Sequence, residues 1–383
     1  MRERAAVSFP VVVGALLGCV ALAGIGCGGT IGEHQDAGIG GDARAGEGGG
    51  GDGAAGGDGG GSDAAPGLDG GADDGAQGDA AAGTGLAASY PGDIGLETDP
   101  AVVWFEGFEE GSVAAVTARY EQAQNQAGMT LVADVPAKSG GTASMKLTSS
   151  VSANATDLYK KLPDHDEWFV RWYAKYQAGI TWHHSGVWVG GYNPASNWPS
   201  PQAGLKPNGD DRFSVSIEPV YGVGGNAPRF DFYNYWMTMH SWMAVPSGDT
   251  AYYGNGLVHQ SSFTIDEGQW VCLEVHVKVN PGASSASGAV LEVWKNDLLV
   301  QSFTDAGPLG YWIRDKFSPT GADGQECTDY PAPADTVLDL QLRNTAALRL
   351  NAFWPQNYIT EGPEGSVQYD HMVVATRYVG CLR

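Results

Sequence analysis

All twelve tryptophans of this 383-residue chain lie between Trp104 and Trp354. The stretch 28–88, in contrast, consists almost entirely of Gly, Ala and Asp. Such a stretch has little apolar surface to bury, so the hydrophobic effect cannot offset the conformational entropy lost on ordering it. We therefore predict a disordered linker over 28–88 and a folded domain over 92–383.

The first 27 residues have the pattern of an export signal. A basic start at residues 1–4 precedes an apolar run over 11–25 that is too short for a stable membrane span. Cys27 and Cys19 each follow a short small-residue box like the one at which bacterial lipoprotein precursors are cleaved and lipidated. We prefer Cys27, which leaves the longer apolar core, and expect a cell-envelope or surface lipoprotein that contacts the membrane only through its lipid. A plain secretory signal is the alternative.

Charge is divided unevenly along the chain. The formal net charge is −23, and about ten of these negative charges fall in the linker 28–88. The folded domain is therefore only moderately acidic, and its Lys and Arg residues form no cluster in the sequence. Because a nucleic-acid backbone requires a basic surface, this composition argues against nucleic acid as a partner. We expect a monomer.

Strand patterns dominate the domain 92–383. Runs rich in β-branched and aromatic residues alternate with Gly, Pro, Asn and Asp, and the one candidate helix, 112–126, has few apolar residues. Many strands without intervening helices predict antiparallel sheets packed face to face, which is an all-β, two-sheet jelly-roll sandwich. The expected strands are 102–105, 144–149, 168–176, 212–218, 230–240, 270–279, 290–294, 336–342 and 369–378.

Three cysteines fall in the folded domain: Cys272, Cys327 and Cys381. Export to an oxidising compartment favours one disulfide with one thiol left over, and three pairings are open. We prefer Cys272 with Cys381, because both lie on or beside predicted strands. Cys327 lies in a loop rich in Gly, Asp and Pro.

Alternation along the strand 168–176 predicts a sugar-binding face. Its core set of Trp and Val residues opposes a mixed aromatic and basic set that includes Arg171, Tyr173 and Lys175. Together with Tyr233 and Tyr235, these side chains would suit an open groove, because aromatic rings stack on sugars and cations pair with uronate carboxylates. Ordinary packing of the rings between layers is the alternative.

A second strand supplies a further basic residue. In 212–218 the set Phe213, Val215 and Ile217 is apolar, so Arg212 is predicted to face outward, where it can bind substrate.

The pair His183-His184 follows the strand 168–176 after a short turn. A neutral imidazole near a tyrosine hydroxyl can remove the proton next to a carboxylate and return one to the leaving oxygen, which is β-elimination. Hydrolysis would need two carboxylates flanking the bond, and the sequence has no Glu-x-Asp-x-x-Glu ladder. Motifs for a nucleophile elbow, a zinc helix, a phosphate loop or a dinucleotide site are also absent from the sequence. A structural role for the two histidines is the alternative.

Carboxylates near the two ends of the domain are candidate metal ligands. Glu106 and Glu109 lie near the first strand and Asp370 lies on the last. First and last strands of jelly rolls commonly lie side by side, so the three could share a structural calcium ion. Solvated turn carboxylates are the alternative, and the predicted chemistry requires no cofactor.

Several segments resemble those of one known group of proteins. These are 168–176, Gly190-Gly191, Tyr233-Asn234-Tyr235, 268–274 and 369–376. In this order they resemble the concanavalin A-like jelly rolls of polysaccharide lyase families 14 and 20, the alginate and glucuronan lyases, and related fungal cellulose-induced proteins. The resemblance covers roughly 100–380. It implies that Tyr233 and Tyr235 line the cleft and that one of them transfers a proton.

The chain also departs from the family 14 pattern. Where that pattern has Gly-Lys-Leu-Pro-Gly, this chain has His183-His184-Ser185-Gly186-Val187, which is closer to the use of histidine as the base in glucuronan lyases. We therefore expect a polysaccharide-active jelly roll that cleaves uronate-containing chains. One of the two histidines would take the C5 proton, one of the two tyrosines would protonate the leaving oxygen, and Arg171 and Lys175 would neutralise the carboxylate. A non-catalytic lectin-like module and an adhesin are the alternatives.

Overall fold

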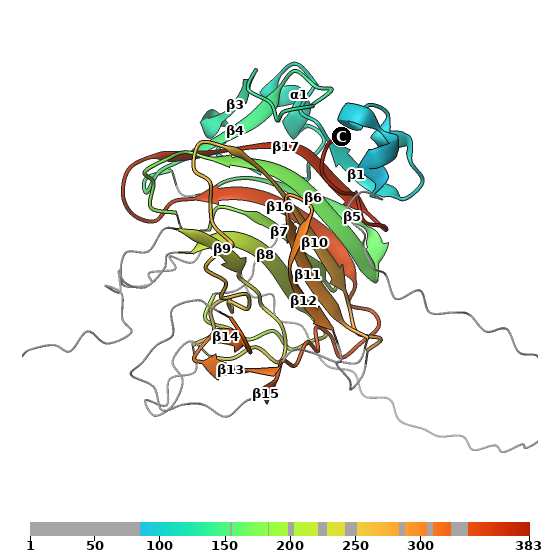
Figure 1. Cartoon of the computed structure of the whole chain (residues 1–383), viewed down its shortest axis with the longest axis vertical. Coiled ribbons are helices and arrows are strands. Elements are labelled where there is room, and N and C mark those ends of the chain that lie inside the picture. The colour runs from blue at the N-terminus through green and yellow to red at the C-terminus, as the bar shows by residue number, and fades with distance from the viewer. Residues whose placement is uncertain are drawn as a thin grey trace, which may run out of the picture.

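The computed structural model describes residues 85–153, 155–182, 184–197, 203–220, 228–241, 251–282, 288–304, 309–322 and 336–383. In these ranges the chain forms two large antiparallel sheets and one small sheet (Figure 1). The predicted all-β, two-sheet jelly-roll sandwich is therefore confirmed. The export signal, both cysteines proposed for lipidation, His183 and Cys327 lie outside the described residues.

The larger sheet has eight strands. The long strands at its centre alternate apolar and polar residues, as the sequence pattern requires for a sheet with one face on the core. Their order is β12 (Leu298–Thr304), β11 (Val290–Lys295), β10 (Trp270–Lys278), β6 (Glu167–Tyr176), β17 (Gly365–Ala375), β4 (Ser144–Ser149) and β3 (Met129–Val132), and β1 (Val102–Glu106) pairs with β17.

The second sheet has six strands and packs across the core from the first. Its order is β2 (Gln122–Gln124), β5 (Ala155–His165), β16 (Leu350–Tyr358), β7 (Val187–Tyr192), β8 (Arg212–Val220) and β9 (Arg229–Phe232). A three-stranded sheet is built from β14 (Lys316–Pro319), β13 (Leu309–Ile313) and β15 (Thr336–Val337). The short helices are η1 (Leu86–Ser89), η2 (Pro91–Asp93), η3 (Leu96–Thr98), α1 (Val113–Thr117) and η4 (Gln126–Gly128).

The hydrophobic core fills the space between the two large sheets. The apolar set of β10 is fully buried, as alternation predicts, and so is the apolar set of β8 on the facing sheet. Burying one such side chain contributes about 1.5–3 kcal/mol, so these paired apolar faces supply most of the force that holds the layers together. Each sheet therefore turns its other face outward.

The outward face of the eight-stranded sheet is covered by both ends of the folded chain, and we call it the capped face. The helices η1 to η3 lie beside the C-terminus in Figure 1, and the backbone N–H groups of Leu86 and Ala87 donate to the carbonyls of Tyr378 and Val379. Leu86 and Ala87 are buried there. Residues 85–91 therefore pack with the folded domain, although the sequence placed 85–88 in the predicted linker, the rest of which lies outside the described residues.

A disulfide fastens the C-terminal part of this cover to the sheet. It joins Cys272 on β10 to Cys381, the pair preferred from the sequence, and their Cα atoms lie 6.0 Å apart. The disulfide closes a loop of about 110 residues, and loops of that length give the largest entropic stabilisation when they are closed.

Several local predictions were wrong. The helix expected over 112–126 is only α1, capped by the Ser112 hydroxyl, and the chain then continues into β2. Tyr120 ends the helix because its hydroxyl donates to buried Glu106. The strand expected over 230–240 ends at Phe232, and the strand expected over 336–342 is only the two-residue β15.

Within the described residues, no helix combines the length and the apolar character needed to cross a lipid bilayer.

Candidate functional site

The outward face of the six-stranded sheet carries a hollow, and we call this the site face. Strand register places Ala352, Gly190 and Ser214 opposite one another on β16, β7 and β8. Because their side chains are small, these three residues leave a depression that runs across the sheet. A Cβ atom added at Gly190 would lie 2.2 Å from the carbonyl oxygen of Phe213, so no larger residue fits there. The hollow encloses about 200 Å³, counted with its open mouth.

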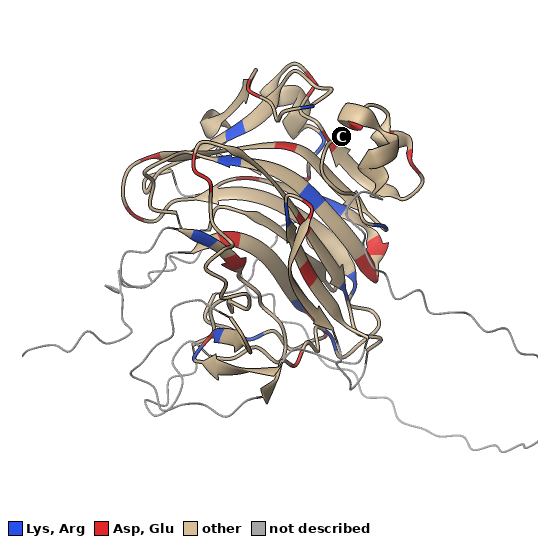
Figure 2. Ribbon diagram, viewed as in Figure 1, with Lys and Arg blue, Asp and Glu red and all other residues tan. Residues whose placement is uncertain are grey.

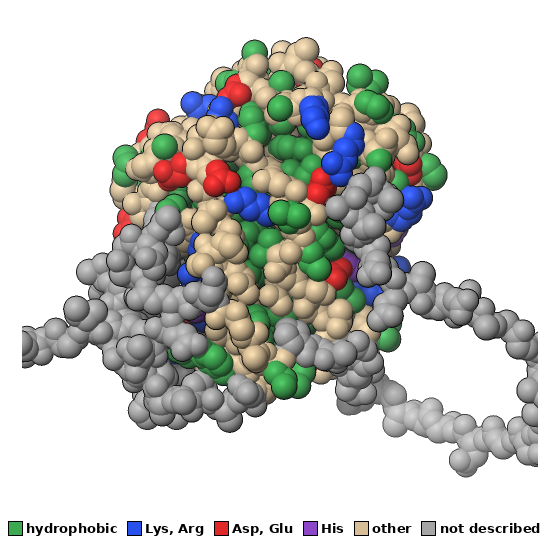
Figure 3. Space-filling model, viewed as in Figure 1, with side chains coloured by type: hydrophobic (Ala, Val, Ile, Leu, Met, Phe, Trp, Pro, Cys, Tyr) green, Lys and Arg blue, Asp and Glu red, His purple; other side chains and the backbone are tan. Residues whose placement is uncertain are grey.

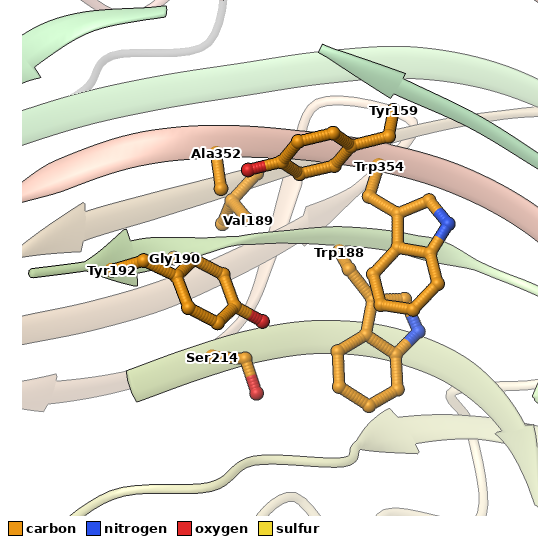
Figure 4. A pocket seen from close by; sticks show the side chains of 8 residues that line it. All are labelled: Tyr159, Trp188, Val189, Gly190, Tyr192, Ser214, Ala352 and Trp354. Carbon is orange, nitrogen blue, oxygen red and sulfur yellow. The ribbon is translucent and has the colours of Figure 1, made fainter. Parts of the chain in front are cut away.

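Aromatic rings surround this row of small residues. Register places Trp354 opposite Trp188 in the neighbouring row, with their ring centroids 5.6 Å apart. Tyr159 of β5 and Tyr192 of β7 complete the wall, and Figure 4 shows the four rings around the gap above Gly190. The hollow is shallow and walled by rings, and aromatic rings are the side chains that stack on sugars.

Polar atoms in the wall lack partners. The indole Nε1 atoms of Trp188 and Trp354 and the hydroxyl of Ser214 are buried without a hydrogen bond of good geometry among the described residues. A buried donor without a partner costs about 1–3 kcal/mol, and native proteins contain few of them. Three such groups line one hollow, and other buried indoles, among them those of Trp168 and Trp172 in the core, also lack such a bond.

The predicted histidine and tyrosines come together on the same face. The carbonyl of His184 accepts a hydrogen bond from the N–H of Tyr358 at the end of β16, which fixes the backbone of His184 just before β7. The His184 ring centroid lies 4.6 Å from that of Tyr233, and the hydroxyls of Tyr233 and Tyr235 lie 3.4 Å apart. The sequence thus identified three residues that the fold places in one cluster.

Glu218 orients the imidazole, and sequence reasoning missed this role. Its Oε2 atom lies 2.8 Å from Nδ1 of His184. Alternation on β8 placed Glu218 on the outward face, but only the three-dimensional fold brings it to the histidine 34 residues away. A carboxylate on Nδ1 favours the tautomer with its proton on Nδ1, which leaves the Nε2 lone pair available to accept a proton.

The Tyr233 ring is partly exposed, whereas Tyr235 is fully buried. Tyr235 stacks on Trp188, with ring centroids 6.3 Å apart, and Trp188 also contacts the Tyr233 ring. The histidine and tyrosine cluster is therefore continuous with the aromatic wall of the hollow. One substrate chain lying over the hollow can reach both.

A second carboxyl faces outward on this sheet. Asp157 of β5 is 1 % exposed and pairs in register with Gln124 and Gln356. The Trp354 indole and the Gln124 backbone N–H lie near enough to lower its pKa, but neither completes a hydrogen bond of good geometry. Desolvation is the larger effect and raises the pKa of Asp157 to about 7.

Three of the predicted groove residues are not on the site face, and that prediction was wrong. Arg171, Tyr173 and Lys175 project from β6 onto the capped face of the other sheet. Arg171 is fully buried in an ion pair with Asp93, and the hydroxyl of Tyr173 accepts a hydrogen bond from the backbone of Leu382. The alternation was correct, but the chain ends cover the face that it predicted to be open.

Lys175 is the third of these residues. Its Nζ atom lies 2.7 Å from Oδ2 of Asp134, and it remains partly exposed. It lies across the sandwich from the histidine and tyrosine cluster, so it cannot neutralise a substrate held there.

Arg212, in contrast, does lie on the site face. It begins β8 opposite Tyr192, two residues before Ser214. Its guanidinium pairs with the Asp211 carboxylate and donates to the carbonyl of Leu205 at 3.1 Å. Because a strand advances about 3.3 Å per residue, Arg212 lies roughly 7 Å along β8 from Ser214.

The predicted calcium ligands do not form a metal site. Glu106 is buried and accepts hydrogen bonds from Arg119 and Tyr120, while Glu109 accepts from the Thr142 and Ala143 amides. Among the described residues, no group of three or more His, Cys, Asp and Glu side chains is arranged to hold a metal ion. Protein donors thus take the place that the prediction gave to calcium for Glu106 and Glu109, and Oδ1 of Asp370 accepts from the His371 backbone N–H.

Charge is dispersed over the molecule. Figure 2 shows Lys, Arg, Asp and Glu interspersed along the ribbons, and on the face drawn in Figure 3 neither sign forms a continuous patch.

No family model matches the sequence. No curated protein matches it either. Solved structures that are similar to this chain at low identity include three polysaccharide-related proteins. The family 14 alginate lyase from Aplysia kurodai has a TM-score of 0.43 and 10% identity, covering 72% of this chain and 99% of that chain.

The endo-β-1,4-glucuronan lyase from the fungus Trichoderma reesei has a TM-score of 0.36 and 12% identity, covering 72% of this chain and 95% of that chain. The cellulose-induced protein Cip1 has a TM-score of 0.36 and 14% identity, covering 66% and 88%. The sequence resemblance named these same three groups of proteins, and that resemblance is confirmed.

Proposed function

We propose that this protein is a polysaccharide lyase that cleaves uronate-containing chains by β-elimination on the site face. The observation that carries the proposal is the His184 imidazole, held by Glu218 at Nδ1 and in contact with the Tyr233 ring. This cluster adjoins a hollow whose indole donors have no protein partner.

His184 acts as the base. With its Nδ1 proton directed at Glu218, the neutral ring offers Nε2 to the proton on C5 of a uronate. As the ring takes up this proton, the carboxylate of Glu218 stabilises the imidazolium that forms, in the way that a buried carboxylate supports the histidine of a hydrolytic triad.

Tyr233 acts as the acid. It is the partly exposed member of the tyrosine pair, and its hydroxyl lies 3.4 Å from that of Tyr235. Tyr233 donates its proton to the glycosidic oxygen that leaves from C4, and the Tyr235 hydroxyl stabilises the developing phenolate by a hydrogen bond. The products are an unsaturated uronate and a new chain end.

Arg212 replaces Arg171 and Lys175 as the basic residue of the site face, and it serves a neighbouring unit of the bound chain. Six residues of β8 separate Arg212 from Glu218, which is roughly 20 Å along the strand. Arg212 therefore pairs with the carboxylate of a unit farther along the chain than the one whose C5 proton reaches His184.

The test is a lyase assay on purified protein. Alginate, glucuronan, pectate and heparin-like chains are each incubated with it, and the ultraviolet absorbance of the unsaturated product is followed. His184→Gln is expected to lower the rate about 10²–10⁴-fold. The matched control is His165→Gln, at the edge of the sandwich beside Trp168, which is expected to keep the rate.

Wild-type protein that gives no absorbance with any of these chains would refute the lyase. Glycan-binding activity is the second candidate, favoured by the unpaired Trp188 and Trp354 donors, which need a ligand but no base. It predicts that wild type and His184→Gln bind the same oligosaccharide equally well and release no product.

We also propose that the domain is exported and held at the cell surface by a lipid on Cys27. The support is the small-residue box before Cys27 and the acidic stretch 28–88, which can act as a spacer. Cells that express the full chain should incorporate labelled fatty acid into it, and Cys27→Ala should abolish the incorporation. Label that persists in Cys27→Ala but disappears in Cys19→Ala would move the anchor to Cys19.

A further inference from the structure

The capped face holds a second cluster with the geometry of a nucleophilic triad. The Oγ atom of Ser139, in the loop between β3 and β4, lies 2.6 Å from Nε2 of His371 on β17. Nδ1 of the same imidazole lies 2.8 Å from Oδ2 of Asp93 in η2. A hydroxyl, an imidazole and a carboxylate joined in this order are the parts that activate a serine.

The electrostatics of this cluster suit each role. Burial works to raise the pKa of Asp93, but the charges of Arg171 and His371 and their hydrogen bonds lower it below the ordinary value. Asp93 is therefore ionised and holds the His371 ring at Nδ1, which leaves Nε2 directed at Ser139. Asp93 and His371 are buried, whereas Ser139 is partly exposed and is the member that a substrate can reach.

Backbone strain lies in and next to this cluster. Asp93 has φ 62°, His371 has φ 46°, and Lys138, directly before Ser139, has φ 68°. Each is a non-glycine residue in the left-handed region, which costs about 1–3 kcal/mol and persists where the surrounding structure enforces it. Three such residues from distant parts of the chain meeting at one cluster are typical of a functional site.

Hydrogen bonding in the cluster is also incomplete. Oδ1 of Asp93, Oδ2 of Asp370, and Nε and one terminal nitrogen of Arg171 are buried without a partner among the described residues. A cluster that served only to fasten the chain ends to the sheet would be expected to satisfy these groups. The Gly141 amide N–H, 2.9 Å from Oγ of Ser139, is the donor nearest to the serine.

We propose that Ser139, His371 and Asp93 form a second active site that transfers the acyl group of a small carboxylic ester. Oγ of Ser139 attacks the ester carbonyl while Nε2 of His371 takes the hydroxyl proton. The C–O bond to the leaving alcohol breaks, and the alcohol receives that proton. Water then attacks the acyl carbon and gives a proton to His371. The bond between that carbon and Oγ breaks, His371 returns the proton to Oγ, and the carboxylic acid and the free serine are released. The Gly141 N–H stabilises the charge on the carbonyl oxygen.

The first test is covalent labelling of the intact, folded protein with a fluorophosphonate probe. We expect modification within the tryptic peptide Ser139–Lys146, which follows Lys138 in the sequence. The peptide also contains Ser144, which is fully buried and donates to the carbonyl of Asp134. Ser139→Ala should therefore abolish the label, and the matched variant Ser144→Ala should keep it.

The second test separates an activated serine from a merely exposed one. His371→Gln should lower both the labelling rate and the hydrolysis of p-nitrophenyl acetate about 100-fold or more, while circular dichroism shows that the fold is kept. Wild-type protein that is not labelled at Ser139 would overturn the proposal. So would equal labelling of Ser139 in the wild type and in a folded His371→Gln variant.

Discussion

The two outward faces of the sandwich carry similar residue types in opposite states. On the capped face, Arg171 and Asp93 form a buried ion pair beneath the two chain ends. On the site face, Trp188 and Trp354 surround an open hollow with their N–H donors unpaired. Both faces are formed by the side chains that alternating strands turn away from the core. The difference arises because the chain ends cover only the capped face.

This comparison shows why charge in a strand is a poor sign of a binding face. A buried charge must find an opposite charge, and the chain ends provide one for Arg171. The indole N–H donors of Trp188 and Trp354, in contrast, have no acceptor of good geometry among the described residues. On this reasoning the proposed sugar-binding site lies on the face that carries the aromatic hollow.

The comparison is tested most strongly by Arg171→Met. Removing one partner of a buried ion pair leaves the other charge uncompensated, so we expect unfolding free energy to fall by about 3–5 kcal/mol. Glycan binding and lyase activity on the site face should be unchanged in the protein that remains folded. Urea unfolding followed by tryptophan fluorescence measures the first quantity, and the lyase assay the second.

The matched control for that variant is Lys175→Met on the same strand. Its ion pair with Asp134 is partly exposed, so its loss should cost about 0–1 kcal/mol. If Arg171→Met instead abolished activity at full stability, Arg171 would belong to the substrate site and the assignment of the two faces would be reversed.

The sequence predicted the eight-stranded sheet far better than the six-stranded sheet. Strands such as β10 bury one face against the core, and their alternating Val and Leu residues make that visible. The central strands of the other sheet, β5, β7 and β16, were missed. Their sequences mix Gly, Pro and Asn with aromatics, because the outward side of each lines a hollow instead of meeting water uniformly.

The candidate site was predicted in part for the same reason. His184, Tyr233 and Tyr235 carry chemistry in their side chains and could be singled out one at a time. Glu218, Trp354 and Tyr159 acquire their roles only from the register between strands that lie far apart in sequence. The cover over Arg171 depends on Asp93, 78 residues away, which no local pattern indicates.

A smaller effect sharpens the comparison, because each face has a buried carboxyl with the same pKa. Burial raises the pKa of both Asp157 and Glu274 to about 7. Glu274, on the capped face, accepts hydrogen bonds from the backbone N–H groups of Val379 and Gly380, one on each carboxylate oxygen. Asp157, on the site face, has no such partners. Replacing each by its amide should therefore have different consequences.

For Asp157 the effect depends on pH. A carboxyl whose pKa is raised on folding takes up its proton more readily in the folded state. Its contribution to stability is therefore complete below the ordinary pKa near 4 and is lost as pH rises through about 7. Asp157→Asn removes the buried charge, so the variant should exceed the wild type by about 2–4 kcal/mol at pH 8 and match it near pH 4.5. Urea unfolding at both pH values measures this difference.

Glu274→Gln provides the contrast at low pH, where both carboxyls are protonated and charge plays no part. The amide has one acceptor oxygen for two backbone donors, and its NH₂ group would face the Val379 or the Gly380 N–H. We expect a loss of about 1–3 kcal/mol near pH 4.5, the cost of leaving a buried donor unsatisfied. If Asp157→Asn lost as much at that pH, then Asp157 would have protein partners after all. The contrast between Asp157 and Glu274 would then be lost, and Asp157 would give no support to a polar ligand at the hollow.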